Sequence, residues 1–144
     1  ETEGRKLERE IDERLTRIAD GVAVVEERAP GAVEAVKERL SERLSALMDE
    51  PPVDETRVAQ EIVIYAERSD FTEEVVRLRA HIEHAQESVA SDGPAGKRLN
   101  FLVQEMHREA NTIGSKNVDP EMAGRVVSLK EEIEKLREQV QNVE

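Results

Sequence analysis

The sequence has no cysteine and no tryptophan, and aromatic residues make up only 2% of its 144 residues. Without cysteine, disulfides and thiolate metal sites are excluded. With so few aromatic rings the core must be aliphatic, and together with 38% charged residues this is typical of helical bundles and coiled coils. No apolar run approaches the ~18 residues that a membrane span needs and no signal peptide opens the chain, so we expect no membrane partner.

The length and the charge set further bounds. A chain of 144 residues is the size of one domain, so we expect a single helical domain over residues 1–144. It opens on Glu1 rather than on methionine, which is expected of a processed chain or a fragment. A net charge of −12 counts against binding of nucleic acid, because phosphates need a basic surface. The charge is uneven, however, and the locally basic segment 97–116 sets two glutamates against four bases, Lys97, Arg98, Arg108 and Lys116.

Apolar residues recur at steps of three and four through almost the whole chain, which predicts amphipathic α-helices. No stretch has the alternation of a strand. We therefore predict an all-α fold, an antiparallel bundle of long, coiled-coil-like helices. About six helices are expected, at about 3–28, 33–47, from 54 onward, 71–89, 99–113 and 122–143.

Proline and glycine are expected to separate these helices. Ala29-Pro30-Gly31 should break the first helix from the second, and Pro51-Pro52 should stop the second. Asp92-Gly93-Pro94 should end the fourth helix in a short turn. Because a short turn joins antiparallel neighbours, the fourth and fifth helices are expected to pack side by side.

Capping residues mark the other boundaries. Asp54 is expected to be the N-cap of the third helix, and Asp70-Phe71-Thr72-Glu73 resembles a capping box with aspartate in place of serine or threonine. Gly114 stands where a left-handed C-cap belongs. Asp119-Pro120 combines an N-cap with proline at the first helical position.

Several polar residues are not explained by the apolar stripes. On the fourth helix one stripe runs at steps of four, three and four through Asp70, Glu74, Arg77 and His81. On the fifth helix two neighbouring lines hold Glu105, Glu109 and Thr112, and Gln104, Arg108 and Asn111. The residues after Gly114 add Ser115, Lys116 and Asn117.

Two interpretations of these stripes are open. The charged residues can be ordinary surface pairs along a helix, His81 a residue at the flank of the core, and Asn111 and Thr112 partners of carbonyls near a helix end. Alternatively, the stripes of two antiparallel helices face one cleft. Carboxylates would then hold a divalent metal, an imidazole would act as acid or base, and Arg or Lys would stabilise charge on a phosphodiester. No spacing here matches a named metal motif.

Three segments resemble the YicC-like proteins. They are "AERSDFTEEVVRLRAHI" (66–82), "GKRLNFLVQEMHREANTIGSK" (96–116) and the ending "LKEEIEKLREQVQNVE" (129–144). The resemblance covers essentially the whole chain, and the Arg-Glu-Ala-Asn-Thr-Ile-Gly-Ser-Lys run within it is highly specific. It implies a bacterial, cytoplasmic endoribonuclease that cuts RNA internally, depends on a divalent cation (Mn²⁺ or Mg²⁺) and assembles as a homohexamer.

The family's signature polar residues fall on the stripes found above. We therefore predict catalytic roles for Glu74, Arg77, His81, Glu105, Arg108 and Glu109. Within this set the expected metal ligands are Glu74, Glu105 and Glu109, and His81 is the expected proton shuttle. The expected RNA contacts are Lys97, Arg98, Arg108, Asn111, Ser115 and Lys116, of which Arg108 and Lys116 would hold the scissile phosphate.

The chain departs from the family pattern at a few positions. Glu67, Asn100 and His107 replace the usual Asp, Asp and Asn. Nothing here resembles the family's N-terminal domain, so we expect the C-terminal helical half alone. The alternative function is a helical oligomerisation module and RNA clamp without independent catalysis.

Overall fold

The computed structural model describes residues 3–47, 55–94 and 96–142, and these hold five α-helices and no strand. The helices are α1 (Glu3–Leu47), α2 (Glu55–Arg68), α3 (Thr72–Asp92), α4 (Lys97–Lys116) and α5 (Pro120–Gln141). The predicted all-α fold of long antiparallel helices is confirmed. In the part of the chain described, no helix is long and apolar enough to cross a membrane.

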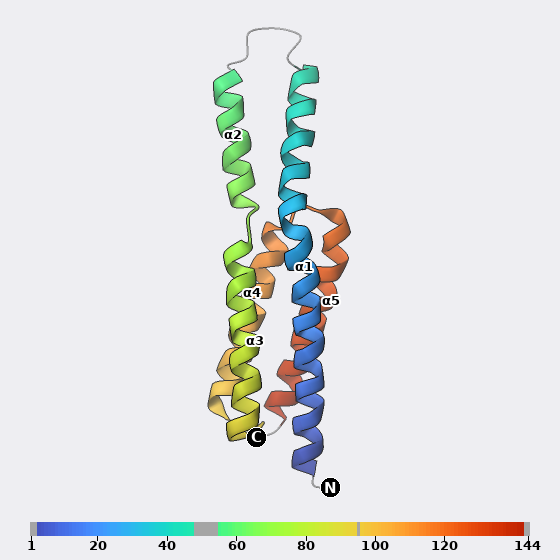
Figure 1. Ribbon diagram of the computed structural model, residues 1–144, viewed down its shortest axis with the longest axis vertical. Helices are drawn as coiled ribbons and strands as arrows, with labels where there is room; N and C mark the ends of the chain where they lie inside the picture. Colours follow the sequence, from blue (N-terminus) through green and yellow to red (C-terminus); the bar gives the residue numbers. More distant parts are fainter. Residues whose placement is uncertain (1–2, 48–54, 95, 143–144) are drawn as a thin grey trace.

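The first half of α1 forms a four-helix bundle with α3, α4 and α5 (Figure 1). Around the bundle the order is α1, α3, α4, α5, and each helix runs antiparallel to both of its neighbours. The seam between α3 and α4 therefore lies on the opposite side of the bundle from the seam between α1 and α5. This arrangement positions the two surfaces described below.

The core of the bundle is aliphatic, as the composition predicts. Every third or fourth residue of each helix is buried, as shown by Leu15 on α1, Leu78 on α3, Met106 on α4 and Ile133 on α5, none of which is exposed. Burying a side chain of this size stabilises the fold by about 1.5–3 kcal/mol. The repeated steps of three and four thus hold the helices at fixed positions around one core.

The rest of α1 and all of α2 extend beyond the bundle as a two-helix arm, made of residues 30–47 and 55–68 (Figure 1). Val36 and Ala66 are buried there, and α2 packs against α1. Three consecutive apolar residues of α2, Val63, Ile64 and Tyr65, are at least 40% exposed. The arm therefore has a small core, and α2 exposes three apolar side chains in a row.

The predicted break at Ala29-Pro30-Gly31 is wrong, because α1 continues through Pro30. The carbonyl that loses its helical partner at Pro30 is that of Glu26, and because Glu26 is exposed, this carbonyl can bind water instead. Val25 and Val36 lie three turns apart on one stripe, and both are buried. Packing on both sides of Pro30 therefore outweighs the local preference for a break.

The aspartate caps differ from one another. Asp119 is the N-cap of α5, where its side chain accepts a hydrogen bond from Glu121 N and Pro120 follows, as predicted. The capping box at Asp70 is wrong, since the N-cap of α3 is Phe71. Asp70 precedes that cap, and its carboxylate accepts from the N–H and the hydroxyl of Thr72.

The two glycine boundaries also differ. Gly93, directly after α3, has φ +75°, which a side chain would strain, so the predicted stop at 92–94 is confirmed. The predicted C-cap at Gly114 is wrong, because α4 continues to Lys116 and ends at Asn117. A Cβ on Gly114 would lie 3.5 Å from Val126 Cγ1, which is an ordinary contact distance, so neither a left-handed turn nor a close approach requires glycine here. The predictions for Pro51-Pro52 and Asp54 fall outside the described residues.

Candidate active site on the α3–α4 seam

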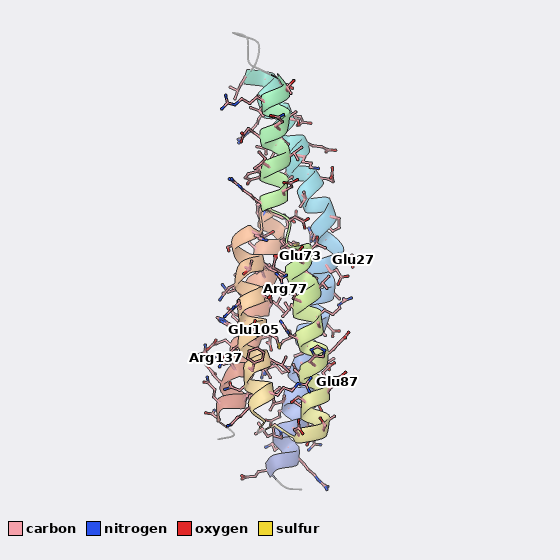
Figure 2. The ribbon with its side chains drawn as sticks, turned by 90° about the vertical axis from the view of Figure 1, so that its left-hand side faces the viewer. Glu27, Glu73, Arg77, Glu87, Glu105 and Arg137 are labelled. Carbon is pink, nitrogen blue, oxygen red and sulfur yellow. The ribbon has the colours of Figure 1, made fainter. Side chains whose placement is uncertain are left out.

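His81 on α3 faces Glu105 and Glu109 on α4. One ligand atom from each of the three side chains lies within 4.8 Å of the other two. Glu109 is buried, whereas Glu105 and His81 are half-buried, so the group opens to solvent along one edge. Glu105 and Glu109 are one helical turn apart, and the antiparallel packing of α3 and α4 brings His81 to their level. Figure 2 shows Glu105 on this side of the bundle, below Glu73 and Arg77.

Arg77 connects the buried Glu109 to two further carboxylates. Its Nε donates a hydrogen bond of 3.0 Å to Glu109 Oε1. Its terminal nitrogens lie 3.5 Å from Glu73 Oε2 and 3.7 Å from Glu74 Oε1. The hydrogen bond to Glu109, with the nearby acidic charges, raises the pKa of Arg77, so the guanidinium stays charged. The contact fixes one oxygen of Glu109.

Besides its contact with Arg77, Glu74 forms a closer ion pair with Lys116. Its side chain is only 3% exposed, and Lys116 Nζ donates to both of its oxygens, at 3.0 and 2.9 Å. Glu74 and His81 are seven residues apart, about 10 Å along α3, and Glu74 is not among the three side chains whose ligand atoms come together. The structure thus groups Glu105 and Glu109 with His81, and pairs Glu74 with Lys116.

Asp70 and Lys116 hold the upper end of the seam. Lys116 Nζ also donates to the carbonyl of Asp70, at 3.4 Å. The pKa of the Asp70 carboxyl is lowered, first because the Thr72 hydroxyl and N–H donate to it and then because Lys116 is near. Lys116 therefore ties the end of α4 to the start of α3, and the turn predicted at Gly114 is not needed to direct it there.

The four bases predicted to bind RNA are spread along α4. Lys97 and Arg98 are exposed at its start, and Lys116 lies at its end, about 28 Å away. Arg108 is 74% exposed and 3.8 Å from Glu105 Oε1, at the rim of the carboxylate group. These bases therefore line one helix, and Arg108 is the one beside the candidate site.

The remaining predicted polar residues bond mainly within α4. Ser115 Oγ donates to the carbonyl of Asn111, and Thr112 Oγ1 donates to that of Arg108. Asn111 Nδ2 lies 3.1 Å from His107 Nδ1, and His107 Nε2 lies 3.6 Å from Glu134 of α5. Because the hydroxyls of Thr112 and Ser115 donate to carbonyls of their own helix, these contacts support a structural role for both residues.

The donor set suits a hard divalent cation. Two carboxylates and one imidazole are common ligands of Mn²⁺, and metal–oxygen bonds of about 2.1 Å place opposite ligands about 4.2 Å apart. The three ligand atoms of His81, Glu105 and Glu109 already lie within 4.8 Å of one another, so small side-chain movements would place them around one ion. The sequence placed His81 in the cleft as an acid or base. That it is also a possible ligand follows only from the register between the helices.

The fold and this site define an all-α protein with a carboxylate–imidazole group between two helices, and comparison with known proteins identifies the family. Residues 25–144 match the family "Endoribonuclease YicC-like, C-terminal". The chain is 43% identical over 143 residues to the probable endoribonuclease YicC of Clostridioides difficile. It is 36% identical over 142 residues to the probable endoribonuclease YicC of Haemophilus influenzae.

Both alignments cover 99% of this chain and 49% of the relative. The chain thus spans about half the length of the curated relatives it matches. With a family match over most of its length, it belongs to the YicC-like endoribonuclease family.

Proposed function

We propose that this chain forms the metal-binding and RNA-cleaving half of an endoribonuclease, with its active site on the α3–α4 seam. The observation that carries the proposal is the convergence of His81, Glu105 and Glu109 within 4.8 Å in a chain of this family. A fully exposed acidic face would not place a buried carboxylate beside an imidazole. The predicted substrate is RNA, cut at an internal phosphodiester.

Each side chain has a distinct role in this proposal. Glu105 and Glu109 hold the cation, Mn²⁺ or Mg²⁺, which when bound supplies positive charge to the phosphate and activates water. Arg77 fixes one oxygen of Glu109, so the other is directed to the ion. Arg108, at the exposed rim, contacts the scissile phosphate. His81 gives or accepts the proton.

Metal binding is the direct test. Calorimetric titration of the full-length protein with Mn²⁺ should reveal one binding site. The affinity of that site for Mn²⁺ should fall at least ~10-fold in Glu109→Gln, because a ligand is lost. Glu87→Gln is the matched control, because Glu87 is an exposed carboxylate of α3 away from the three-residue group. Cleavage of structured RNA should stop with EDTA and return with Mn²⁺. Equal Mn²⁺ affinity in both variants, or cleavage in EDTA, would contradict the proposal.

The arm favours a second role, in assembly of copies of this chain. Val63, Ile64 and Tyr65 expose apolar surface on a two-helix arm that the bundle does not cover, and the resemblance to the family implies a homohexamer. We expect Ile64→Ser with Tyr65→Ser to reduce the mass measured by light scattering and to leave the circular dichroism spectrum unchanged. An unchanged mass would remove the arm from the interface.

A further inference from the structure

A groove lies on the opposite side of the bundle from the candidate active site, between α1 and α5. Its volume is about 430 Å³, and it is lined by Arg17 and Gly21 from α1 and by Gly124, Arg125 and Ser128 from α5, among others. These helices are the first and the last of the five, and neither contributes to the carboxylate group on the α3–α4 seam.

Two ion pairs between α1 and α5 bracket this groove and neutralise its acidic residues. Arg14 Nη1 lies 2.6 Å from Glu132 Oε2, and Arg14 Nε donates to Gln139 at 2.8 Å. Toward the other end, Arg28 pairs with Glu121. Glu121 and Glu132 both line the groove, so its two carboxylates are already matched by cations outside it.

The two cations that line the groove have no such match. Among the described residues, neither Arg17 nor Arg125 makes an ion pair or a side-chain hydrogen bond, although both belong to the lining. The groove thus carries two unpaired guanidinium groups in a chain whose net charge is −12. That local excess of positive charge selects for an anion.

Glycine keeps the groove open. A Cβ on Gly124 would meet no atom within 4 Å, and one on Gly21 would lie 3.5 Å from Leu129 Cδ1. Neither glycine has a positive φ, so neither is needed for the backbone conformation. Glycine is less favourable than alanine inside a helix, so its presence twice at this point calls for open space.

We propose that the α1–α5 groove binds a phosphoryl group on Arg17 and Arg125, with the Ser128 hydroxyl as a further donor. The planar fork of arginine donates two hydrogen bonds to phosphate oxygens, which makes it the preferred residue for this ligand. The phosphoryl group comes from an RNA strand or from free phosphate, and both present the same oxygens. The groove lies on α1 and α5, whereas the candidate active site lies on α3 and α4. The phosphoryl site can therefore be tested independently of the proposed function.

The test uses three variants of the full chain, in EDTA so that bound metal does not contribute. Arg17→Gln with Arg125→Gln removes the charge, and Gly124→Leu fills the groove at a position with free space. Arg39→Gln with Arg43→Gln is the control, since it removes the same number of charges from α1 on the arm, outside the groove. Binding of inorganic phosphate is measured by calorimetry and binding of a short fluorescent oligoribonucleotide by anisotropy. Circular dichroism verifies that each variant is folded.

We expect phosphate, the oligoribonucleotide or both to bind the parent chain and the control variant with equal affinity. The same probe should bind at least 10-fold more weakly to the double arginine variant and to Gly124→Leu. Loss of oligoribonucleotide binding alone identifies an RNA phosphodiester, and loss of phosphate binding alone identifies free phosphate. The proposal is overturned if neither probe binds, or if the groove variants bind as the control does. It is also overturned if they change only the oligomeric mass, since the groove would then be a protein interface.

Discussion

At the scale of single residues, the seam between α3 and α4 depends on a buried charge. Glu74 is almost wholly removed from solvent, and both of its oxygens accept from Lys116. A buried carboxylate that loses its partner is left with the full cost of desolvation, which exceeds the value of a normal hydrogen bond. Lys116 is itself 35% exposed, and Arg77 remains 3.7 Å from Glu74 Oε1, and both moderate the effect.

Lys116→Met should therefore lower the free energy of unfolding by about 1–3 kcal/mol, measured by urea denaturation. Lys97→Met is the matched control, because Lys97 is an exposed lysine at the other end of α4, and its effect should stay within about 0.5 kcal/mol. Adding Glu74→Gln to Lys116→Met should recover part of the loss, since the buried charge disappears. Equal effects of the two lysine variants would show that the pair does not stabilise the seam.

His81→Ala tests the proton role in the full-length protein. Cleavage of RNA should fall by about 10²-fold, the usual size of a general acid or base contribution, and the affinity for Mn²⁺ should change little. His84→Ala should cleave normally, because His84 lies on the same helix but is exposed and outside the three-residue group. A large loss of Mn²⁺ affinity in His81→Ala would instead make His81 a ligand.

The residues of the candidate site could be named from the sequence, but their grouping could not. Periodicity places Glu74, Arg77 and His81 on one stripe of α3, and the short turn after Asp92 places α4 beside it. It does not give the register between the helices. That register places Glu74 beside Lys116. Two turns further along α3, it places His81 beside the carboxylates of Glu105 and Glu109 on α4.

At the scale of the helices, boundaries follow the sequence where a single group dominates. Glycine is required at position 93 because φ is positive there. Aspartate is favoured at position 119 because its carboxylate accepts a hydrogen bond from the N–H of Glu121. Pro30 and Gly114 show the limit of such reasoning, because both are helix breakers held inside helices by their surroundings. Burial of Val25 and Val36 decides the first case, and in the second the ion pair of Lys116 with Glu74 holds the last turn of α4 against α3.

Two glycines of similar local sequence should respond in opposite ways to alanine. Gly31→Ala should raise the free energy of unfolding by up to about 1 kcal/mol, since Gly31 is inside α1 and a Cβ there meets no atom within 4 Å. Gly93→Ala should lower it by about 1–3 kcal/mol, because alanine is strained at φ +75°. Thermal and urea unfolding measure both. A stabilised Gly93→Ala would contradict the helix end described here.

At the scale of the whole molecule, positive charge is scarce and is distributed over several surfaces. Lys97, Arg98 and Arg108 are exposed along α4, whereas Lys116 is engaged with Glu74. Any RNA that follows α4 past the candidate site would meet the first three in turn. Each phosphate contact contributes to the dependence of affinity on salt.

Replacing Lys97, Arg98 and Arg108 together by glutamine should weaken RNA binding by the full-length protein. It should also reduce the slope of log K against log salt by about 2, given about 0.7 per phosphate for a single strand. The same number of charges removed from the arm, at Lys37, Arg39 and Arg43, is the control. A larger effect of the arm variant would place the RNA surface on the arm.

The pairing of α1 with α5 also bears on the order in which the helices pair during folding. α3–α4 and α4–α5 are neighbours in the chain and need to close only short loops, whereas α1 and α5 are the first and last helices. Closing a longer loop is slower and comes at a higher entropic cost, and a ribosome delivers the N-terminal end first. While the chain is being made, the side of α1 that holds Ile18 and Gly21 has to wait for α5, with which it lines the groove. The groove with Arg17 and Arg125 exists only once α1 and α5 have come together, so a phosphoryl ligand bound there would report that this pairing has formed.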